Sequence, residues 1–234
     1  AVQRPRRRMK SALALLQGAW LYATRPRLQE PTGPREGTLG HGPDLRLLIL
    51  GDSAAAGVGV ATQDDALAGH LLRALAENRT VYWRLAARCG ATTASTLKRL
   101  QALPAEPFDV VLMAVGINDA KNGVAKNTYR NNYRTIIETL RTRHSAGIIL
   151  CTALPPVLSF PTVPEPLRSI MGTHAAEFDI ILQDLCTEMG TTYLPHDAPP
   201  DPNMLAADGL HPGAPYYQLW ADAAATQIKK ALTP

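Results

Sequence analysis

The sequence predicts an α/β domain in which a five-stranded parallel sheet lies between two layers of helices. Short apolar runs alternate with amphipathic helical segments, and Gly or Pro stands at several of the junctions. The chain has 234 residues, of which 46% are hydrophobic and 19% charged, so it can bury a sizeable core and does not have a disordered composition. It contains neither an internal repeat nor a low-complexity block. We therefore expect one domain over residues 44–234, preceded by an N-terminal arm and linker over residues 1–43.

Short apolar runs mark the expected strands. The run LRLLIL at residues 45–50 ends at Gly51 and suits a strand that is buried on both faces. The run FDVVLMAV at residues 108–115 is apolar and β-branched, which favours a strand. The expected strands are residues 45–50, 81–87, 108–115, 148–154 and 191–194.

Apolar residues at helical spacing mark the segments between these strands. In the last long segment before the fifth strand, apolar side chains recur from Met171 to Met189, and Gly190 suits a helix end. The expected helices are residues 64–78, 93–103, a segment around 129–140, 171–189 and 215–232.

The basic charge of the chain belongs to its N-terminal arm. Residues 1–27 hold seven of the 24 Lys and Arg residues and no acidic residue, which leaves 17 basic against 20 acidic residues elsewhere. The sequence therefore gives no support for a body that binds nucleic acid. We expect residues 26–43, rich in Pro and Gly, to form an extended linker.

An apolar run over residues 11–23 follows the basic cluster and leaves three alternatives open. It has the outline of a signal peptide, of a helix lying in a membrane surface, or of a helix packed on the body or on a second subunit. A signal peptide is disfavoured because the bulky Leu21 stands where a cleavage site needs a small residue. We therefore expect a cytoplasmic chain or one in peripheral contact with a membrane, rather than a secreted one.

The three cysteines, Cys89, Cys151 and Cys186, are too few and too scattered for a disulfide scaffold or a C-x-x-C metal pair. All three stand in apolar stretches, so we expect each to be a small buried hydrophobic residue.

Polar residues follow four of the expected strands. In a parallel sheet, ligands bind beyond the carboxyl ends of the strands, so these residues should gather at one edge. The segments, in chain order, are Gly51-Asp52-Ser53, Cys89-Gly90-Ala91, Gly116-Ile117-Asn118-Asp119 and Asp208-Gly209-Leu210-His211-Pro212.

These segments hold the residue types that nucleophilic catalysis needs. The Ser53 hydroxyl requires a base, and His211 has Asp208 three residues earlier to hold its second ring nitrogen. Attack on a carbonyl also creates an oxyanion, which requires preorganised donors. The candidate donors are the backbone N–H groups of Ser53 and Gly90 and the side-chain amide of Asn118.

In this order, the four segments resemble the sequence blocks of the SGNH, or GDSL-type, hydrolases, over about residues 45–232. The resemblance implies a flavodoxin-like three-layer α/β/α fold and hydrolysis of esters or thioesters through an acyl-enzyme, with neither cofactor nor metal. It also assigns the roles. Ser53 would be the nucleophile, His211 the base and Asp208 its orienting acid. Ser53, Gly90 and Asn118 would form the oxyanion hole.

Other readings of the same segments are weaker. We expect Asp52 and Asp119 to hold their own loops through backbone N–H groups rather than to act in the triad. The pair His196-Asp197 is set aside, because adjacent residues on an extended segment point apart. The glycine-rich segment 51–59 lacks the Gly-Lys-Ser/Thr ending of a nucleotide-binding loop. A catalytically silent interaction module of the same fold is the other alternative.

The segment after the fourth strand indicates the substrate. Residues 154–161 are apolar and contain three prolines, and aromatic residues make up only 6% of the chain, which favours an acyl chain over a sugar. We expect the partner to be a small-molecule ester with a short to medium acyl chain. Thioesterase or lysophospholipase activity and carbohydrate O-deacetylation are the alternatives.

Overall fold

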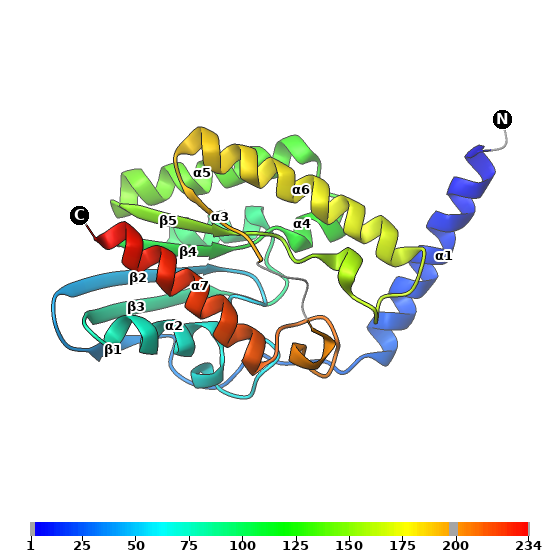
Figure 1. Ribbon diagram of the computed structural model, residues 1–234. Coiled ribbons are helices and arrows are strands. Elements are labelled where there is room, and N and C mark those ends of the chain that lie inside the picture. The colour runs from blue at the N-terminus through cyan, green and yellow to red at the C-terminus, as the bar shows by residue number, and fades with distance from the viewer. Residues whose placement is uncertain (1–2, 197–200, 234) are drawn as a thin grey trace.

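The computed structural model of the chain describes residues 3–196 and 201–233. A central sheet lies between helices on both of its faces, in the three layers that the sequence predicts (Figure 1). The strands are β1 (Glu36–Gly40), β2 (Asp44–Gly51), β3 (Thr80–Ala87), β4 (Val110–Ala114), β5 (Ile148–Thr152) and β6 (Thr192–Leu194). The α-helices are α1 (Gln3–Thr24), α2 (Leu67–Ala76), α3 (Thr93–Ala102), α4 (Ile117–Lys121), α5 (Lys126–His144), α6 (Leu167–Met189) and α7 (Ala214–Leu232).

Strand β2 lies at the centre of the sheet and is buried on both faces. Its successive side chains point to opposite sides. Leu47 and Ile49 enter the core that α2 and α7 cover, whereas Leu48 and Leu50 enter the core under α3, α5 and α6. This double burial explains why the run is almost entirely apolar, as expected for a central parallel strand.

The sheet differs from the prediction in one edge strand. It has six strands in the order β1-β3-β2-β4-β5-β6, and β1 runs antiparallel to β3 while the other pairs are parallel. The five predicted strands are present as β2 to β6 and are parallel, so the fold class is confirmed, but the predicted strand count was one too few. Strand β1 falls within residues 26–43, so part of the expected linker belongs to the sheet. All five of its residues are exposed, so it has no apolar pattern from which a strand could be predicted.

Helix α1 packs against α6 through one face. Ala14 is buried there, and the Gln17 amide donates a hydrogen bond of 2.6 Å to the carbonyl of Glu165. Of the three alternatives for this segment, the structure shows a helix packed on the body. None of the helices within residues 3–196 and 201–233 is long and apolar enough to cross a membrane. The division of the chain at residue 43 stays a prediction.

Candidate active site

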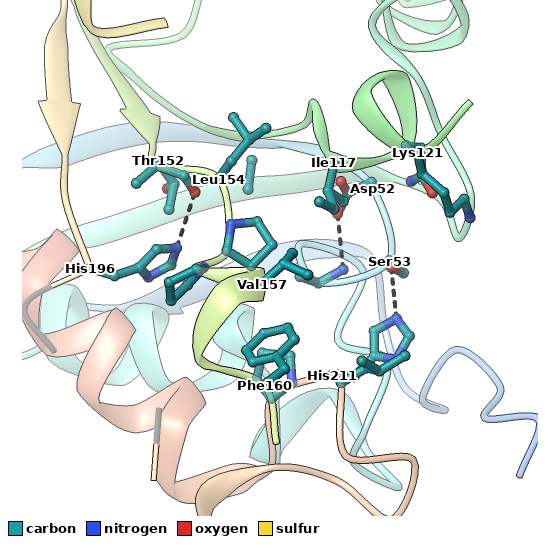
Figure 2. Close-up of a pocket in the computed structure, with 18 of the residues that line it drawn as sticks. Asp52, Ser53, Ile117, Lys121, Thr152, Leu154, Val157, Phe160, His196 and His211 are labelled. Atoms are coloured by element: carbon teal, nitrogen blue, oxygen red, sulfur yellow. Dashed lines mark hydrogen bonds between the residues drawn. The ribbon is translucent and has the colours of Figure 1, made fainter. Parts of the chain in front are cut away.

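The segments after β2, β4 and β6 meet at one edge of the sheet. Ser53 follows β2, Asn118 lies on α4 directly after β4, and His211 stands in the turn before α7. All three line the same pocket, as the strand-end rule predicts. Figure 2 shows Ser53 and His211 facing each other on one side of this pocket.

Ser53, His211 and Asp208 form a continuous chain of hydrogen bonds. The Ser53 Oγ lies 2.9 Å from His211 Nε2, and His211 Nδ1 lies 2.5 Å from Asp208 Oδ2. The other carboxylate oxygen, Asp208 Oδ1, accepts the backbone N–H groups of Leu210 at 2.9 Å and His211 at 3.0 Å. The three residues that the sequence proposes as a triad are therefore linked through His211, although Ser53 and His211 are 158 positions apart.

The charge of Asp208 fixes the tautomer of His211. Burial acts to raise the pKa of Asp208, but the hydrogen bonds from the imidazole and from two backbone N–H groups outweigh it and lower the pKa to about 2. An ionised carboxylate only accepts hydrogen bonds, so Nδ1 carries the proton of a neutral His211. Nε2 is then free to accept a hydrogen bond from the Ser53 hydroxyl, as a general base must.

Gly59 allows the loop of the nucleophile to touch the turn of the base. A Cβ on this residue would lie 2.1 Å from the carbonyl oxygen of Pro212, and its φ of +123° is unfavourable for any other residue. The Tyr217 hydroxyl adds a 2.8 Å hydrogen bond to the carbonyl of Val58, which ties the start of α7 to the same loop. These contacts hold Ser53 and His211 in register.

The structure gives different support to each of the three proposed oxyanion donors. Asn118 lines the pocket and donates one amide hydrogen to the carbonyl of Ala91 at 3.0 Å, which leaves a second amide hydrogen. In the described part of the chain, no backbone partner accepts the N–H of Ser53 or of Gly90. Gly90 is exposed, and its φ of +76° is what requires glycine, because a Cβ there would meet nothing within 4 Å. Its donor role stays a prediction.

The two other aspartates hold loops, although not both in the expected way. Asp52 accepts the N–H of Ala54 in its own loop at 3.1 Å. Asp119 instead reaches the first residue of α3, where it accepts hydrogen bonds from the N–H and the hydroxyl of Thr93 at 2.8 and 2.6 Å. Burial raises the pKa of Asp52 to about 7 and also raises that of Asp119. Asp119 and Asn118 together fasten the Gly90 loop to α4.

The pocket beside Ser53 is a mainly apolar cavity of about 210 Å³. Its walls come from the loops after β4 and β5, as expected, with Leu154, Val157 and Phe160 contributed by the second of these. Figure 2 shows Val157 and Phe160 between His196 at one side and Ser53 at the other. A cavity with this lining suits the apolar part of a substrate.

Sequence reasoning missed several residues that line this pocket, among them His196 and Leu21. His196 lines the pocket and lies 3.1 Å from the carbonyl of Ala153, whereas Asp197 lies outside the described residues. Leu21 of α1 also lines the pocket, and no motif marks it.

Cys151 and Cys186 are buried as predicted, but Cys89 is exposed, so the prediction of burial was wrong for Cys89. Its N–H donates to Glu30 at 2.6 Å.

The described residues contain no group of three or more His, Cys, Asp or Glu side chains placed to hold a metal ion. The three-layer fold with serine, histidine and aspartate joined at its strand ends is the architecture of the SGNH class of hydrolases. A model of the GDSL-like Lipase/Acylhydrolase family matches residues 49–219, and the chain belongs to this family.

One curated relative is the GDSL-like esterase Rv1075c of Mycobacterium tuberculosis (strain ATCC 25618 / H37Rv). The two sequences are 29% identical over 203 residues, which cover 81% of this chain and 63% of the relative. The chain therefore spans less than two thirds of the length of that protein.

Solved structures share the fold. TesA matches with a TM-score of 0.65 and 24% identity, over 80% of this chain and 99% of that one. The psychrotrophic esterase EstA from Pseudoalteromonas sp. matches with a TM-score of 0.63 and 21% identity, over 81% and 99% of the two chains. Est24, a carbohydrate acetylesterase from Sinorhizobium meliloti, matches with a TM-score of 0.60 and 16% identity, over 80% and 100%. At these identities the matches show a common architecture.

Proposed function

We propose that the protein is a serine esterase that hydrolyses carboxylic esters with short to medium acyl chains through an acyl-enzyme. One observation carries the proposal. The Ser53 hydroxyl lies 2.9 Å from an imidazole whose other nitrogen is held at 2.5 Å by a carboxylate, at the side of an apolar cavity. This arrangement provides a nucleophile, its base and a place for the acyl chain.

In the first half of the reaction, Ser53 Oγ attacks the ester carbonyl carbon while His211 Nε2 takes the hydroxyl proton. The negative charge on the carbonyl oxygen is stabilised by the N–H groups of Ser53 and Gly90 and by the free amide hydrogen of Asn118. Asp208 stabilises the imidazolium that forms. The tetrahedral intermediate then collapses, the bond to the alcohol breaks, and His211 gives its proton to the departing oxygen.

In the second half, water replaces the alcohol. His211 Nε2 takes a proton from the water as its oxygen attacks the acyl carbon, and the same donors hold the second oxyanion. Collapse of this intermediate releases the carboxylic acid and returns the proton to Ser53. The balance is one ester and one water in, one acid and one alcohol out.

The test is turnover of nitrophenyl esters of increasing acyl length by the wild-type chain and by Ser53→Ala. We expect wild-type activity to favour short and medium acyl groups and Ser53→Ala to lose at least about 10³-fold in kcat. Ser145→Ala, at an exposed serine that follows α5 and does not line the pocket, is the matched control and should keep full activity. A labelled fluorophosphonate should modify the wild type and the control but not Ser53→Ala, because only an activated serine reacts.

Two results would contradict the proposal. Full activity of Ser53→Ala would show that Ser53 is not the nucleophile. Absence of labelling in the wild type would favour a catalytically silent module of the same fold. Acyl-CoA and acetylated xylan are assayed beside the nitrophenyl esters. Turnover confined to acetylated xylan would replace the acyl-ester assignment with carbohydrate O-deacetylation, and preference for acyl-CoA would indicate a thioesterase.

A further inference from the structure

Helix α1 lies outside residues 49–219, which the family model matches, yet it contacts the active site. From residue 12 onward, where side-chain burial is described, its partly or fully buried residues follow the i, i+3, i+4, i+7 pattern and so share one face. They are Ala14, Gln17, Gly18 and Leu21, followed by Arg25 just after the helix end. The residues between them are exposed. One side of α1 is therefore built to rest on the body.

Gln17 fixes the middle of the helix to the start of α6. Its Nε2 donates to the carbonyl of Glu165 at 2.6 Å, and its Oε1 accepts the N–H of Leu167 at 3.2 Å. Both hydrogen-bonding groups of the side chain are thus used on one neighbouring turn. Since the helix rises about 1.5 Å per residue, this anchor sets where the next two turns lie.

Leu21, one turn further along, reaches the substrate cavity. It lines the same pocket as Ser53 and His211 and packs with the apolar cluster that contains Val157, Phe160 and Val163. The residue is only partly buried, because its remaining surface faces the cavity and the solvent. An acyl chain that fills this cavity would meet the Leu21 side chain.

Arg25 reaches the turn that carries the proposed triad. Its guanidinium donates to the carbonyl oxygen of Asp208 and, at 2.5 Å, to that of Thr162. The Thr162 hydroxyl in turn donates to the carbonyl of Gly209 at 2.8 Å. A charged donor with a planar fork can hold two carbonyls in one fixed geometry. Arg25 therefore joins the turn of Asp208 to the segment that forms the pocket wall.

We propose that α1 and the residue that follows it are part of the active site. Arg25 is a positioning residue that holds the Asp208–His211 turn within reach of Ser53, and Leu21 is a wall residue that limits acyl-chain length. This inference rests on the proposed esterase function. The two residues should have different kinetic effects. Loss of Arg25 should displace the turn and slow the reaction of every substrate, whereas a change at Leu21 should alter the preference between short and long acyl chains.

The first arm of the test compares Arg25→Ala, Arg25→Lys and Arg27→Ala. Because small misplacements of catalytic groups are costly, we expect Arg25→Ala to lower kcat by about 10- to 100-fold for all acyl lengths, with little change in KM. Arg25→Lys should recover part of the loss, since an ammonium can still bind one carbonyl. Arg27 is exposed and lies over the ring of Tyr22, so Arg27→Ala should stay within about twofold of the wild type.

The second arm compares Leu21→Ala and Leu21→Trp with the same changes at Leu16, which is 69% exposed on the opposite face of α1. We expect Leu21→Trp to lower kcat/KM for long acyl esters relative to the acetyl ester by roughly tenfold, and Leu21→Ala to shift that ratio the other way. The variants at Leu16 should leave the ratio unchanged.

The proposal needs both effects. It is overturned if Arg25→Ala keeps the kcat of Arg27→Ala, or if thermal unfolding shows that the folded fraction of Arg25→Ala has fallen by the same factor as its kcat. It is also overturned if the Leu21 variants leave the ratio of kcat/KM for long and acetyl esters unchanged. A fluorophosphonate titration of active sites separates slower turnover from a smaller folded fraction. Loss of activity in Ser53→Ala with unchanged Arg25 and Leu21 variants would overturn this inference and leave the esterase proposal standing.

Discussion

Asn118 has two tasks that a single substitution can separate. One amide hydrogen holds the carbonyl of Ala91 at 3.0 Å, and the other is proposed to meet the oxyanion. Loss of one oxyanion donor typically costs about 10²–10³-fold in kcat, so we expect Asn118→Ala to fall in this range with KM nearly unchanged. The measurement is steady-state turnover of a nitrophenyl ester, with Asn122→Ala on the exposed end of the same helix as the control.

The thermal stability of Asn118→Ala separates the two tasks. The lost bond to Ala91 should lower stability by about 0.5–1.5 kcal/mol, which leaves the protein folded. A fall in kcat of less than threefold would take Asn118 out of the oxyanion hole and leave it as a residue that only holds the neighbouring loop.

The residues of the proposed triad could be predicted because each stands next to a strand end or within three positions of its partner. The supports could not be predicted in the same way. Asp119 was expected to hold its own loop, but its partner Thr93 is 26 positions away, and Arg25 is 183 positions from Asp208. Such contacts depend on the path of the whole chain, which no short motif records.

At the scale of elements, α1 presents two different faces. The face described above packs on the body, while the opposite one exposes large apolar side chains. These are Leu13, Leu15, Leu16, Trp20 and Tyr22, between 48% and 76% exposed. A packed helix and a helix that touches a membrane surface are therefore compatible. The surrounding sequence, with seven basic residues and no acidic one in residues 1–27, favours an anionic lipid surface.

We expect the full chain to co-sediment with vesicles that contain anionic phospholipid and to bind neutral vesicles less. The apolar face supplies burial in the headgroup region, and the basic residues supply attraction that salt weakens. Replacing Trp20 and Leu16 together by Ser should reduce binding about tenfold or more, since each buries a large apolar surface.

The control is Leu219→Ser, which removes an exposed apolar side chain from α7, away from α1. Equal sedimentation with and without anionic lipid would contradict the expectation. A doubling of mass in light scattering, abolished by the same double substitution, would assign this face to a second copy of the chain.

The prediction of the fold failed at one edge element, strand β1, and the failure has a physical reason. The sequence of β1, Glu36 to Gly40, has no buried residue, so its pairing with β3 is held by backbone hydrogen bonds and by the 3.1 Å ion pair of Glu36 with Arg84. Neither leaves a periodic apolar signal. The central strands, which bury both faces, were predicted because burial dictates their composition.

For the whole molecule, two buried carboxyls oppose each other in the pH dependence of stability. The pKa of Asp208 is about 2 in the folded chain, below its ordinary value near 3.8, so its contribution is present above pH 4 and is lost as the pH falls toward 2. The pKa of Asp52 is about 7, so the folded chain holds a proton that the unfolded chain releases near pH 4. Stability therefore decreases as the pH rises from about 4 to 7 through Asp52.

Asp52→Asn should remove this second effect. The amide keeps an oxygen for the N–H of Ala54 and cannot ionise, so no buried charge forms as the pH rises. A pKa raised from 3.8 to about 7 corresponds to a free-energy penalty of up to about 4 kcal/mol above pH 7. We expect the stability of Asp52→Asn relative to wild type to increase by a few kcal/mol between pH 4.5 and 7.5.

Urea unfolding at the two pH values measures this change. The comparison between variant and wild type cancels the titration of every group that Asp52 does not touch, and Asp184→Asn, exposed on α6, reports the effect of removing a surface carboxylate. If Asp52→Asn and wild type differ by the same amount at both pH values, Asp52 does not take up its proton in this window. The carboxylate beside the nucleophile would then be stabilised as a charge, through His211 and Lys121, against the burial that opposes it.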